Sequence, residues 1–303
     1  MSRVALSVVT AACLACALLA LSGSSARAQD VPPKFKAGVA LVPITAVVRD
    51  SRGRLVRGLT RDDFEVLEDN QHRAIVEFRA TDHAPVSLAL LFDTSSSMRE
   101  GNHLKGRSVV DALSTVIDPK SDEAALFTFD QRLRQETPFT NNPDVIRDAA
   151  SRTVAWGQTS LYDAVGDTAK KLADRPSPRQ AVIVITDGVD TSSTQTASDV
   201  SRMASSVDVP VYVVAVAPRR RWFGIGGSSG LSSLARSTGG EQLGAVTPEE
   251  AATAVAALMT ELRQQYFLAI EAAATPGWHR IEVRARQKNV KVRARSGYFA
   301  GTQ

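Results

Sequence analysis

Cysteine is nearly absent from this sequence. The 303 residues include two cysteines, Cys13 and Cys16, and both lie near the amino terminus. The segment around them has the pattern of a secretory signal peptide: a positively charged start, an apolar run over residues 4–21 and small residues up to Ala28. We therefore expect a signal peptide over residues 1–28 and a mature chain without disulfide bonds or thiol chemistry.

The same segment sets the expected location of the protein. A membrane anchor is the alternative to a cleaved signal, but small residues interrupt the apolar run and a cleavage pattern follows it. We expect a secreted or periplasmic protein that has no stable membrane insertion once the signal is removed.

The sequence also has few histidines and a small net charge. The four histidines lack the spacing of metal ligands, so a zinc site of the usual His and Cys kind is not expected. They are His72, His83, His103 and His279. The formal net charge is +4, and loss of Arg3 and Arg27 with the signal leaves about +2. This charge is too small to indicate a nucleic-acid partner.

β-strand patterns occupy both ends of the mature chain. Residues 38–80 contain β-rich and alternating segments, and alternation returns over residues 266–300. Each end is too small to bury a core of its own. We therefore predict one β-sandwich, built from residues 29–84 and 266–303, with the rest of the mature chain inserted between them.

The last two β segments predict a hairpin that turns at Gln287–Asn289 and carries charged residues on both strands. They are Arg280, Glu282, Arg284 and Arg286 on the first strand, then Lys291, Arg293 and Arg295 on the second. A solvated face that discourages edge-to-edge aggregation is the favoured interpretation. Attraction to an anionic envelope polymer or lipid is the alternative.

Four near-continuous apolar runs alternate with helix-like segments over residues 85–265. Strands of this kind are buried on both faces, as in a parallel sheet that helices cover. The alternation predicts an α/β fold, a Rossmann-like doubly wound domain. Thr247 and Pro248 are suited to the start of its last helix, the first as the cap and the second as the first helical residue.

Oxygen-bearing side chains cluster at the ends of these predicted strands and helices. Asp93 ends the first apolar strand, and Ser95 and Ser97 follow at alternate positions. Thr159 precedes a predicted helix, and Asp187 follows the most hydrophobic strand. Because open α/β sheets bind ligands at the carboxyl ends of their strands, we expect these side chains to meet. Carboxylates and hydroxyls without nitrogen or sulfur suit Mg²⁺, Mn²⁺ or Ca²⁺.

The order of these five residues resembles the metal-ion-dependent adhesion site (MIDAS) of von Willebrand factor A (VWFA) domains. The matching residues are Asp93, Ser95, Ser97, Thr159 and Asp187. The mature chain is similar to bacterial secreted VWFA-related proteins, and the resemblance implies a domain over residues 85–265 that binds protein ligands through Mg²⁺. It also implies that the hydroxyls touch the metal directly and that the carboxylates often act through water. One departure is Gln158, which stands where the family often has glycine.

The expected function is therefore metal-dependent protein binding, by an adhesion or scaffold module whose ion grips an acidic group of a partner. We do not expect an enzyme. One alternative is that Asp93 to Ser97 only cap the following helix. Another is a secreted metal-dependent hydrolase, but no histidine, cysteine or lysine has a position that ties it to Asp93 as a general base.

A loop rich in arginine, aromatic residues and glycine follows the fourth apolar run. Because this strand should end at the same edge as Asp93, we predict that the loop forms one wall of the ligand site. The ligand-binding residues would be Arg219, Arg220, Arg221, Trp222 and Phe223. Arginine beside tryptophan is a composition enriched in interface hot spots. We interpret the glycines that follow, up to Gly230, as a flexible loop.

Overall fold

A six-stranded sheet forms from the middle of the chain, where the apolar runs predicted it. The computed structural model describes residues 40–80, 84–99, 101–175, 177, 179–188, 190–216 and 228–301. The predicted signal peptide and the segment from Arg219 to Phe223 lie outside these described residues.

The sheet has the strand order β10-β9-β8-β5-β6-β7. Its strands are β5 (Val86–Asp93), β6 (Glu123–Phe129), β7 (Leu133–Gln135), β8 (Arg179–Thr186), β9 (Val211–Ala215) and β10 (Gln242–Gly244). Neighbouring strands are parallel except for the antiparallel pair β6 and β7. Every residue of β5 is buried, as expected for a central strand that is covered on both faces.

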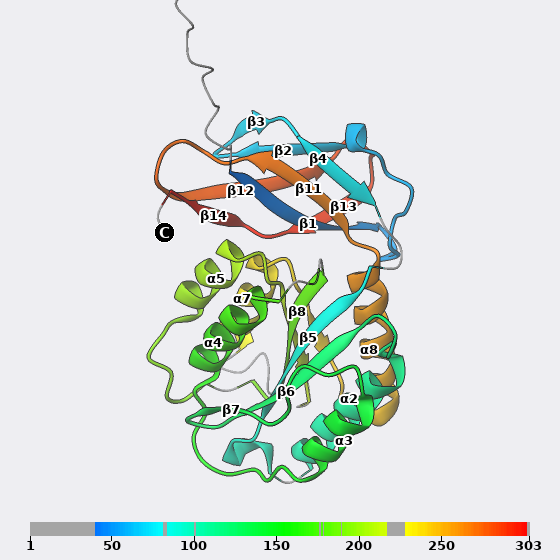
Figure 1. Ribbon diagram of the computed structural model, residues 1–303, viewed down its shortest axis with the longest axis vertical. Helices are drawn as coiled ribbons and strands as arrows, with labels where there is room; N and C mark the ends of the chain where they lie inside the picture. Colours follow the sequence, from blue (N-terminus) through cyan, green and yellow to red (C-terminus); the bar gives the residue numbers. More distant parts are fainter. Residues whose placement is uncertain are drawn as a thin grey trace, which may run out of the picture. The chain divides into compact units, whose positions relative to one another are not determined.

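Helices cover the two faces of this sheet (Figure 1). They are α2 (Asn102–Val116), α3 (Pro143–Ser151), α4 (Leu161–Ala173), α5 (Ala197–Ser206), α7 (Ser228–Ser237) and α8 (Pro248–Arg263). Leu90 and Phe92 belong to the core shared with α2, α3 and α8, whereas Leu91 belongs to the core shared with α4, α5 and α7. No helix in the described parts of the chain is both long and apolar enough to span a membrane.

Helix α8 begins where the sequence predicts. The Thr247 side chain accepts a hydrogen bond from the Glu250 backbone N–H, and Pro248 is the first helical residue. Helix α7 was not predicted, because its first residues lie in the stretch that we interpreted as a flexible loop. A Cβ atom on Gly230 would lie 2.5 Å from the Tyr162 hydroxyl of α4. This glycine therefore permits close packing between helices, and our interpretation of it was wrong.

The two ends of the described chain form a pair of antiparallel sheets, which are labelled in Figure 1. One contains β13 (Val290–Ala294), β1 (Leu41–Asp50), β11 (Tyr266–Glu271) and β4 (Glu77–Ala80), in this order. The other contains β14 (Gly297–Ala300), β12 (Gly277–Ala285), β2 (Phe64–Glu68) and β3 (Gln71–Arg73). Short 3₁₀ turns lie at η1 (Arg61–Asp63) and η2 (Ser96–Met98).

The two antiparallel sheets share one hydrophobic core. Ile44 of β1 lies opposite Leu268 of β11, and both side chains are fully buried. Val66 of β2 and Ile281 of β12 belong to the same core cluster. Residues from both chain ends thus build one β-sandwich, and the predicted fold class is confirmed.

The predicted carboxyl-terminal hairpin is wrong. β12 and β13 lie in different sheets, so the turn at Gln287–Asn289 connects the two layers and does not close a hairpin. The segment expected to form the second strand is split into β13 and β14, which also lie in different sheets. Alternation indicates which residues share a face, but it does not identify the strand that pairs with it.

The charged face predicted for that hairpin is correct only in part: Arg280, Arg284, Arg286 and Lys291 are exposed, whereas two arginines of the second segment are not free at the surface. Arg295 is 3% exposed, and its guanidinium donates a hydrogen bond to the Ser205 carbonyl at the end of α5. Arg293 pairs with Glu241 and with Glu261 of α8. These arginines therefore join the β-sandwich to the α/β part of the chain, within the compact unit Val39–Gln303.

Candidate metal centre

The predicted metal ligands of two strands meet at one edge of the central sheet. β5 and β8 are adjacent and parallel, β5 ends at Asp93, and Asp187 directly follows β8. The carboxyl ends of the two strands therefore place both carboxylates at the same edge. Asp93 is fully buried and Asp187 is 5% exposed.

Two hydrogen bonds fix the orientation of the Asp93 carboxylate. The Ser95 backbone N–H donates to Oδ1 of Asp93 at 2.8 Å, and the Thr186 hydroxyl donates to Oδ2 at 2.5 Å. Sequence reasoning did not identify Thr186, although it directly precedes Asp187 in the chain. Its side chain has no exposure to solvent, so it orients Asp93 from inside the protein.

The serine hydroxyls connect the two halves of the cluster. The oxygens of Ser95 and Ser97 lie 3.0 Å apart, and the Ser97 hydroxyl donates to Oδ1 of Asp187 at 3.0 Å. The side-chain amide of Asn102 lies 3.4 Å from the other oxygen of Asp187. Asn102 was also missed, because it stands in the first turn of α2 without a motif to mark it.

Thr159 is buried next to this cluster, on a neighbouring loop. Its backbone N–H donates to the Thr191 hydroxyl at 2.9 Å, and its carbonyl accepts from the backbone of Thr191. The loop is joined to the serine loop by the Ser96 N–H, which donates to the Gly157 carbonyl at 2.9 Å. Among the described residues, the hydrogen bonds of Thr159 all involve its backbone, so none joins its hydroxyl to Asp93, Ser95, Ser97 or Asp187.

A glycine one position earlier provides the tight turn of this loop. Gly157 has φ of +91°, in the left-handed region that favours glycine, and a Cβ atom there would lie 3.3 Å from Asp130. Gln158 therefore stands where the family often has glycine without removing the turn.

The buried cluster is electrostatically suited to a cation. Burial raises the pKa of Asp93 to about 6, hydrogen bonds from Ser95 and Thr186 oppose the rise, and the charge of Asp187 adds to it. A divalent cation bound at this cluster would offset the cost of burying both charges. The available donors are hydroxyl and carboxylate oxygens, which are ligands of Mg²⁺. No three His, Cys, Asp or Glu side chains gather as a metal-binding group within the described ranges, so the hydroxyls are essential to such a site.

The predicted ligand-site wall from Arg219 to Phe223 lies outside the described residues. The strand that leads to it, β9, ends at Ala215, and the Val216 N–H donates to the Thr186 carbonyl at 3.0 Å. Because Thr186 adjoins Asp187, β9 ends at the same edge of the sheet as the candidate metal centre. The role of the loop itself stays a prediction.

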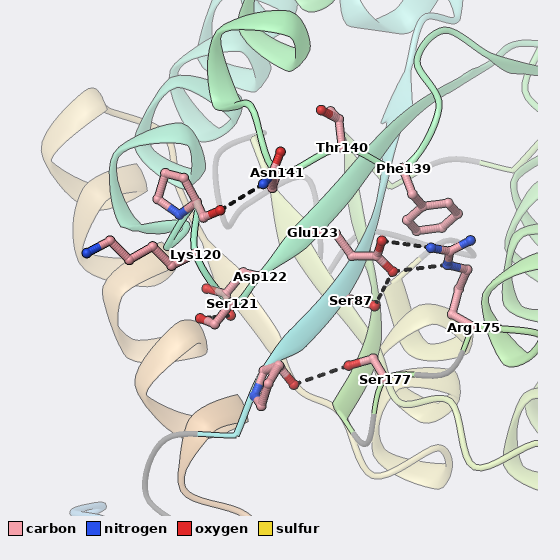
Figure 2. Close-up of a pocket in the computed structure, with 12 residues that line it drawn as sticks. Ser87, Lys120, Ser121, Asp122, Glu123, Phe139, Thr140, Asn141, Arg175 and Ser177 are labelled. Atoms are coloured by element: carbon pink, nitrogen blue, oxygen red, sulfur yellow. Dashed lines mark hydrogen bonds and ion pairs between the residues drawn. The ribbon is translucent and has the colours of Figure 1, made fainter.

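A hollow with a volume of about 630 Å³ lies at the opposite edge of the sheet, at the amino-terminal ends of β5 and β6. Figure 2 shows Glu123 held there between the Ser87 hydroxyl and the Arg175 guanidinium. The Arg175 guanidinium also lies 4.7 Å from the ring centre of Phe139. Because these charges pair with one another, the hollow offers no free charged group from this set to a ligand.

Comparison with known families matches the von Willebrand factor type A (VWA) domain to residues 87–252, more than half of the chain. The chain belongs to this family. The predicted membership of the VWFA family is thereby confirmed, and the five-residue metal site stays a prediction. In this VWA protein, the matched residues contain the complete set of predicted ligands and the parallel sheet that presents them.

Comparison with solved structures agrees on the fold. The conserved hypothetical protein BatB from Bacteroides thetaiotaomicron is similar with a TM-score of 0.51 and 15% identity, over 58% of this chain and 98% of that chain. An aerotolerance-related membrane protein from Bacteroides fragilis NCTC 9343 has a TM-score of 0.49, 15% identity and the same coverage. At this identity the likeness to BatB shows a shared fold alone. The comparison with curated proteins gave no match.

Proposed function

We propose that this VWA protein is a metal-dependent protein-binding module that grips an acidic group of its partner. The observation that carries the proposal is the hydrogen-bonded chain from Ser95 through Ser97 to Asp187, beside the oriented carboxylate of Asp93. Helix capping alone does not explain why Ser97 bonds to an aspartate from a different strand.

Each residue has a distinct task in this proposal. Ser95, Ser97 and Thr159 would hold the ion through their hydroxyls, and Asp93 and Asp187 would act through water. The bound ion supplies positive charge that attracts a carboxylate. Because neutral hydroxyls reduce that charge less than carboxylates would, this donor set leaves the site electrophilic. Thr186 and Asn102 keep the two aspartates oriented.

The places of two histidines favour protein binding over metal-dependent hydrolysis as the function. His103 stacks on Phe92, 5.0 Å between ring centres, and its Nε2 lies 3.0 Å from the Thr153 hydroxyl. His279 belongs to the β-sandwich and pairs with Asp69. Neither is among the hydrogen-bond partners of the serines in the cluster. A general base for a water or serine nucleophile is therefore not supported by these two residues.

We further propose that the protein acts outside the cytoplasm, secreted or periplasmic, with a protein partner and no nucleic acid. The support is the signal-like segment over residues 1–28 and the small net charge. Fractionation of cells that express the full chain tests this location. Recovery of uncleaved protein from the cytoplasm would contradict it.

The experiment for the binding function compares partner retention with and without the ion. The mature wild-type chain and its Asp93→Asn and Ser97→Ala variants are immobilised and exposed to envelope extract in Mg²⁺. We expect proteins that the wild type retains in Mg²⁺ to be released by EDTA and to be absent from both variants. Identical retention on wild type and variants would contradict metal-dependent binding.

A further inference from the structure

Two large apolar side chains are exposed beside the candidate metal centre. Val154 is 77% exposed and Trp156 is 71% exposed, more than any other large apolar residue in the described ranges. They stand two positions apart in the loop between α3 and α4, and the intervening Ala155 is 9% exposed. Exposed apolar side chains that gather at one place mark interaction sites more often than isolated ones do.

The loop holds this pair in a fixed position. The Trp156 backbone N–H donates to the Thr94 carbonyl at 2.6 Å, and Nε of Arg99 lies 3.2 Å from the Ala155 carbonyl. The Arg99 guanidinium is 5.0 Å from the centre of the Trp156 ring. A partner would therefore meet a preorganised surface, which lowers the entropy lost on binding.

Hydrogen bonds connect the loop that carries Val154 and Trp156 to the candidate metal centre. Thr94, which bonds to Trp156, stands between Asp93 and Ser95 in the chain. The next residue, Gly157, bonds to Ser96 through its carbonyl. A segment whose carboxylate reaches the ion is thus brought next to the loop that carries Trp156.

An arginine without a described partner lies next to the apolar pair. A hollow of about 270 Å³ has Thr94, Arg152 and Val154 in its wall. Arg134, also in this wall, pairs with Asp130, and the Glu136 carboxylate accepts a hydrogen bond from the neutral Thr128 hydroxyl. The Arg152 side chain makes no hydrogen bond or ion pair with another described residue. Glu136 supplies one negative charge to the same wall, whereas neither Arg152 nor the nearby Arg99 has a carboxylate partner among the described residues.

We infer that Val154, Trp156 and Arg152 form the specificity surface for a protein segment with an acidic residue beside a bulky apolar residue. This inference rests on the proposed function, because the acidic residue is the one that the ion would bind. The apolar side chain packs on Trp156 and Val154, and Arg152 adds attraction for a second acidic group. The free arginine favours an acidic segment over a second copy of this chain, whose formal charge is positive.

The probe is a set of synthetic peptides, each with one glutamate or aspartate flanked by leucine or phenylalanine, with or without a second acidic residue. Matched peptides carry glutamine or asparagine in place of the acids, or alanine in place of the apolar residue. Dissociation constants are measured by calorimetry on the mature chain in Mg²⁺ and in EDTA. We expect the acidic–apolar peptides to bind in Mg²⁺ and not in EDTA. In Mg²⁺, the peptides without the acids and the peptides without the apolar residue should each bind at least about tenfold more weakly.

Variants separate this inference from the proposed function. Trp156→Ala should weaken the acidic–apolar peptides about tenfold or more and leave Mg²⁺ affinity unchanged, and Arg152→Ala should remove the preference for a second acid. Phe299→Ala is the matched control, because Phe299 is an exposed aromatic residue of the β-sandwich. It should change neither the peptide affinity nor the Mg²⁺ affinity.

Three outcomes would overturn the inference. Metal-dependent peptide binding that survives Trp156→Ala defeats it and leaves the proposed function standing. Absence of metal-dependent peptide binding by the wild type defeats both. A chain that dimerises in ultracentrifugation, and becomes monomeric with Trp156→Ala, assigns the surface to a second copy and also contradicts the inference.

Discussion

Asp93 shows most clearly how single residues prepare the candidate metal centre. Its carboxylate is buried, and hydrogen bonds from the backbone of Ser95 and from the Thr186 hydroxyl hold it in place. The residues of the cluster could be predicted from sequence, since their spacing and their places at strand ends are visible there. The orienting residues Thr186 and Asn102 could not, because their role depends on which strand and helix ends become neighbours in space.

Removing the Thr186 hydroxyl should destabilise the fold. Thr186→Val leaves a buried oxygen of Asp93 without its donor, which costs about 1–3 kcal/mol. Thr168→Val is the matched control, since the Thr168 hydroxyl is buried on α4 with no hydrogen-bond partner in the described residues. In denaturant unfolding without metal, the free energy of unfolding should therefore be lower than that of the wild type for Thr186→Val but not for Thr168→Val. Equal stability of the two variants would contradict the orienting role.

A second residue-scale prediction concerns pH and His279. Its Nδ1 lies 2.7 Å from the Asp69 carboxylate and its Nε2 lies 2.8 Å from the Thr275 carbonyl, so both ring nitrogens face acceptors. The Thr275 carbonyl and then Asp69 raise the pKa of His279. The protonated form therefore stabilises the folded state below the unfolded pKa of about 6.5, and this contribution is lost as pH rises through the higher folded pKa.

Denaturant unfolding of the wild type and of His279→Gln, at about pH 5.5 and about pH 8.5, tests this direction of the pH dependence of stability. The stability lost on substitution should be larger at the lower pH. His72→Gln is the control, because His72 is exposed on β3. A loss that is the same at both pH values would show that His279 is not preferentially protonated in the folded protein.

At the scale of elements, the long buried strands and the α8 helix were predictable, whereas strand partners were not. Continuous apolar runs identify strands covered on both faces, and the β5 sequence does so without ambiguity. The short edge strands β7 and β10 carry too few residues to show a period. Arg293 and Arg295 alternate like a solvated face, but their partners come from distant α/β segments that the local pattern does not reveal.

The junction made by Arg295 should be important for stability. Its guanidinium lies 3.4 Å from the Asp208 carboxylate, and that carboxylate is 17% exposed. Because burial raises the pKa of Asp208 and Arg295 opposes the rise, removal of the arginine leaves the carboxylate poorly compensated. Arg295→Met should lower the free energy of unfolding by about 3–5 kcal/mol.

A double-mutant cycle with Asp208→Asn measures the coupling of the pair. The double variant should lose less stability than the two single losses combined. Arg284→Met on β12 is the control, since Arg284 pairs with Glu282 at the surface and should change stability little. Additive losses would mean that the two charges do not stabilise each other across the junction.

At the scale of the whole molecule, the VWA fold and the β-sandwich are joined by charged groups that are largely withdrawn from solvent. Glu261, at the end of α8, is 1% exposed and bonds to Arg49 of β1 at 2.5 Å and to the Tyr212 hydroxyl of β9 at 2.6 Å. The last VWA helix is thus fixed to the sandwich into which the chain continues. The candidate metal centre lies away from this junction, at the carboxyl edge of the parallel sheet.

We propose that this carboxyl edge of the sheet binds one divalent cation. Calorimetric titration of the mature, metal-free chain with Mg²⁺ tests it most directly, with Mn²⁺ as a second ion. We expect saturable binding of about one ion per chain, and a gain of about 2.7 kcal/mol in the free energy of unfolding when the free ion is at about 100 times its dissociation constant. Both effects should be lost in Asp93→Asn and Ser97→Ala and retained in Asp50→Asn, outside the cluster. Absence of saturable binding by the wild type, or unchanged binding by the two cluster variants, would show that these residues do not form a metal site.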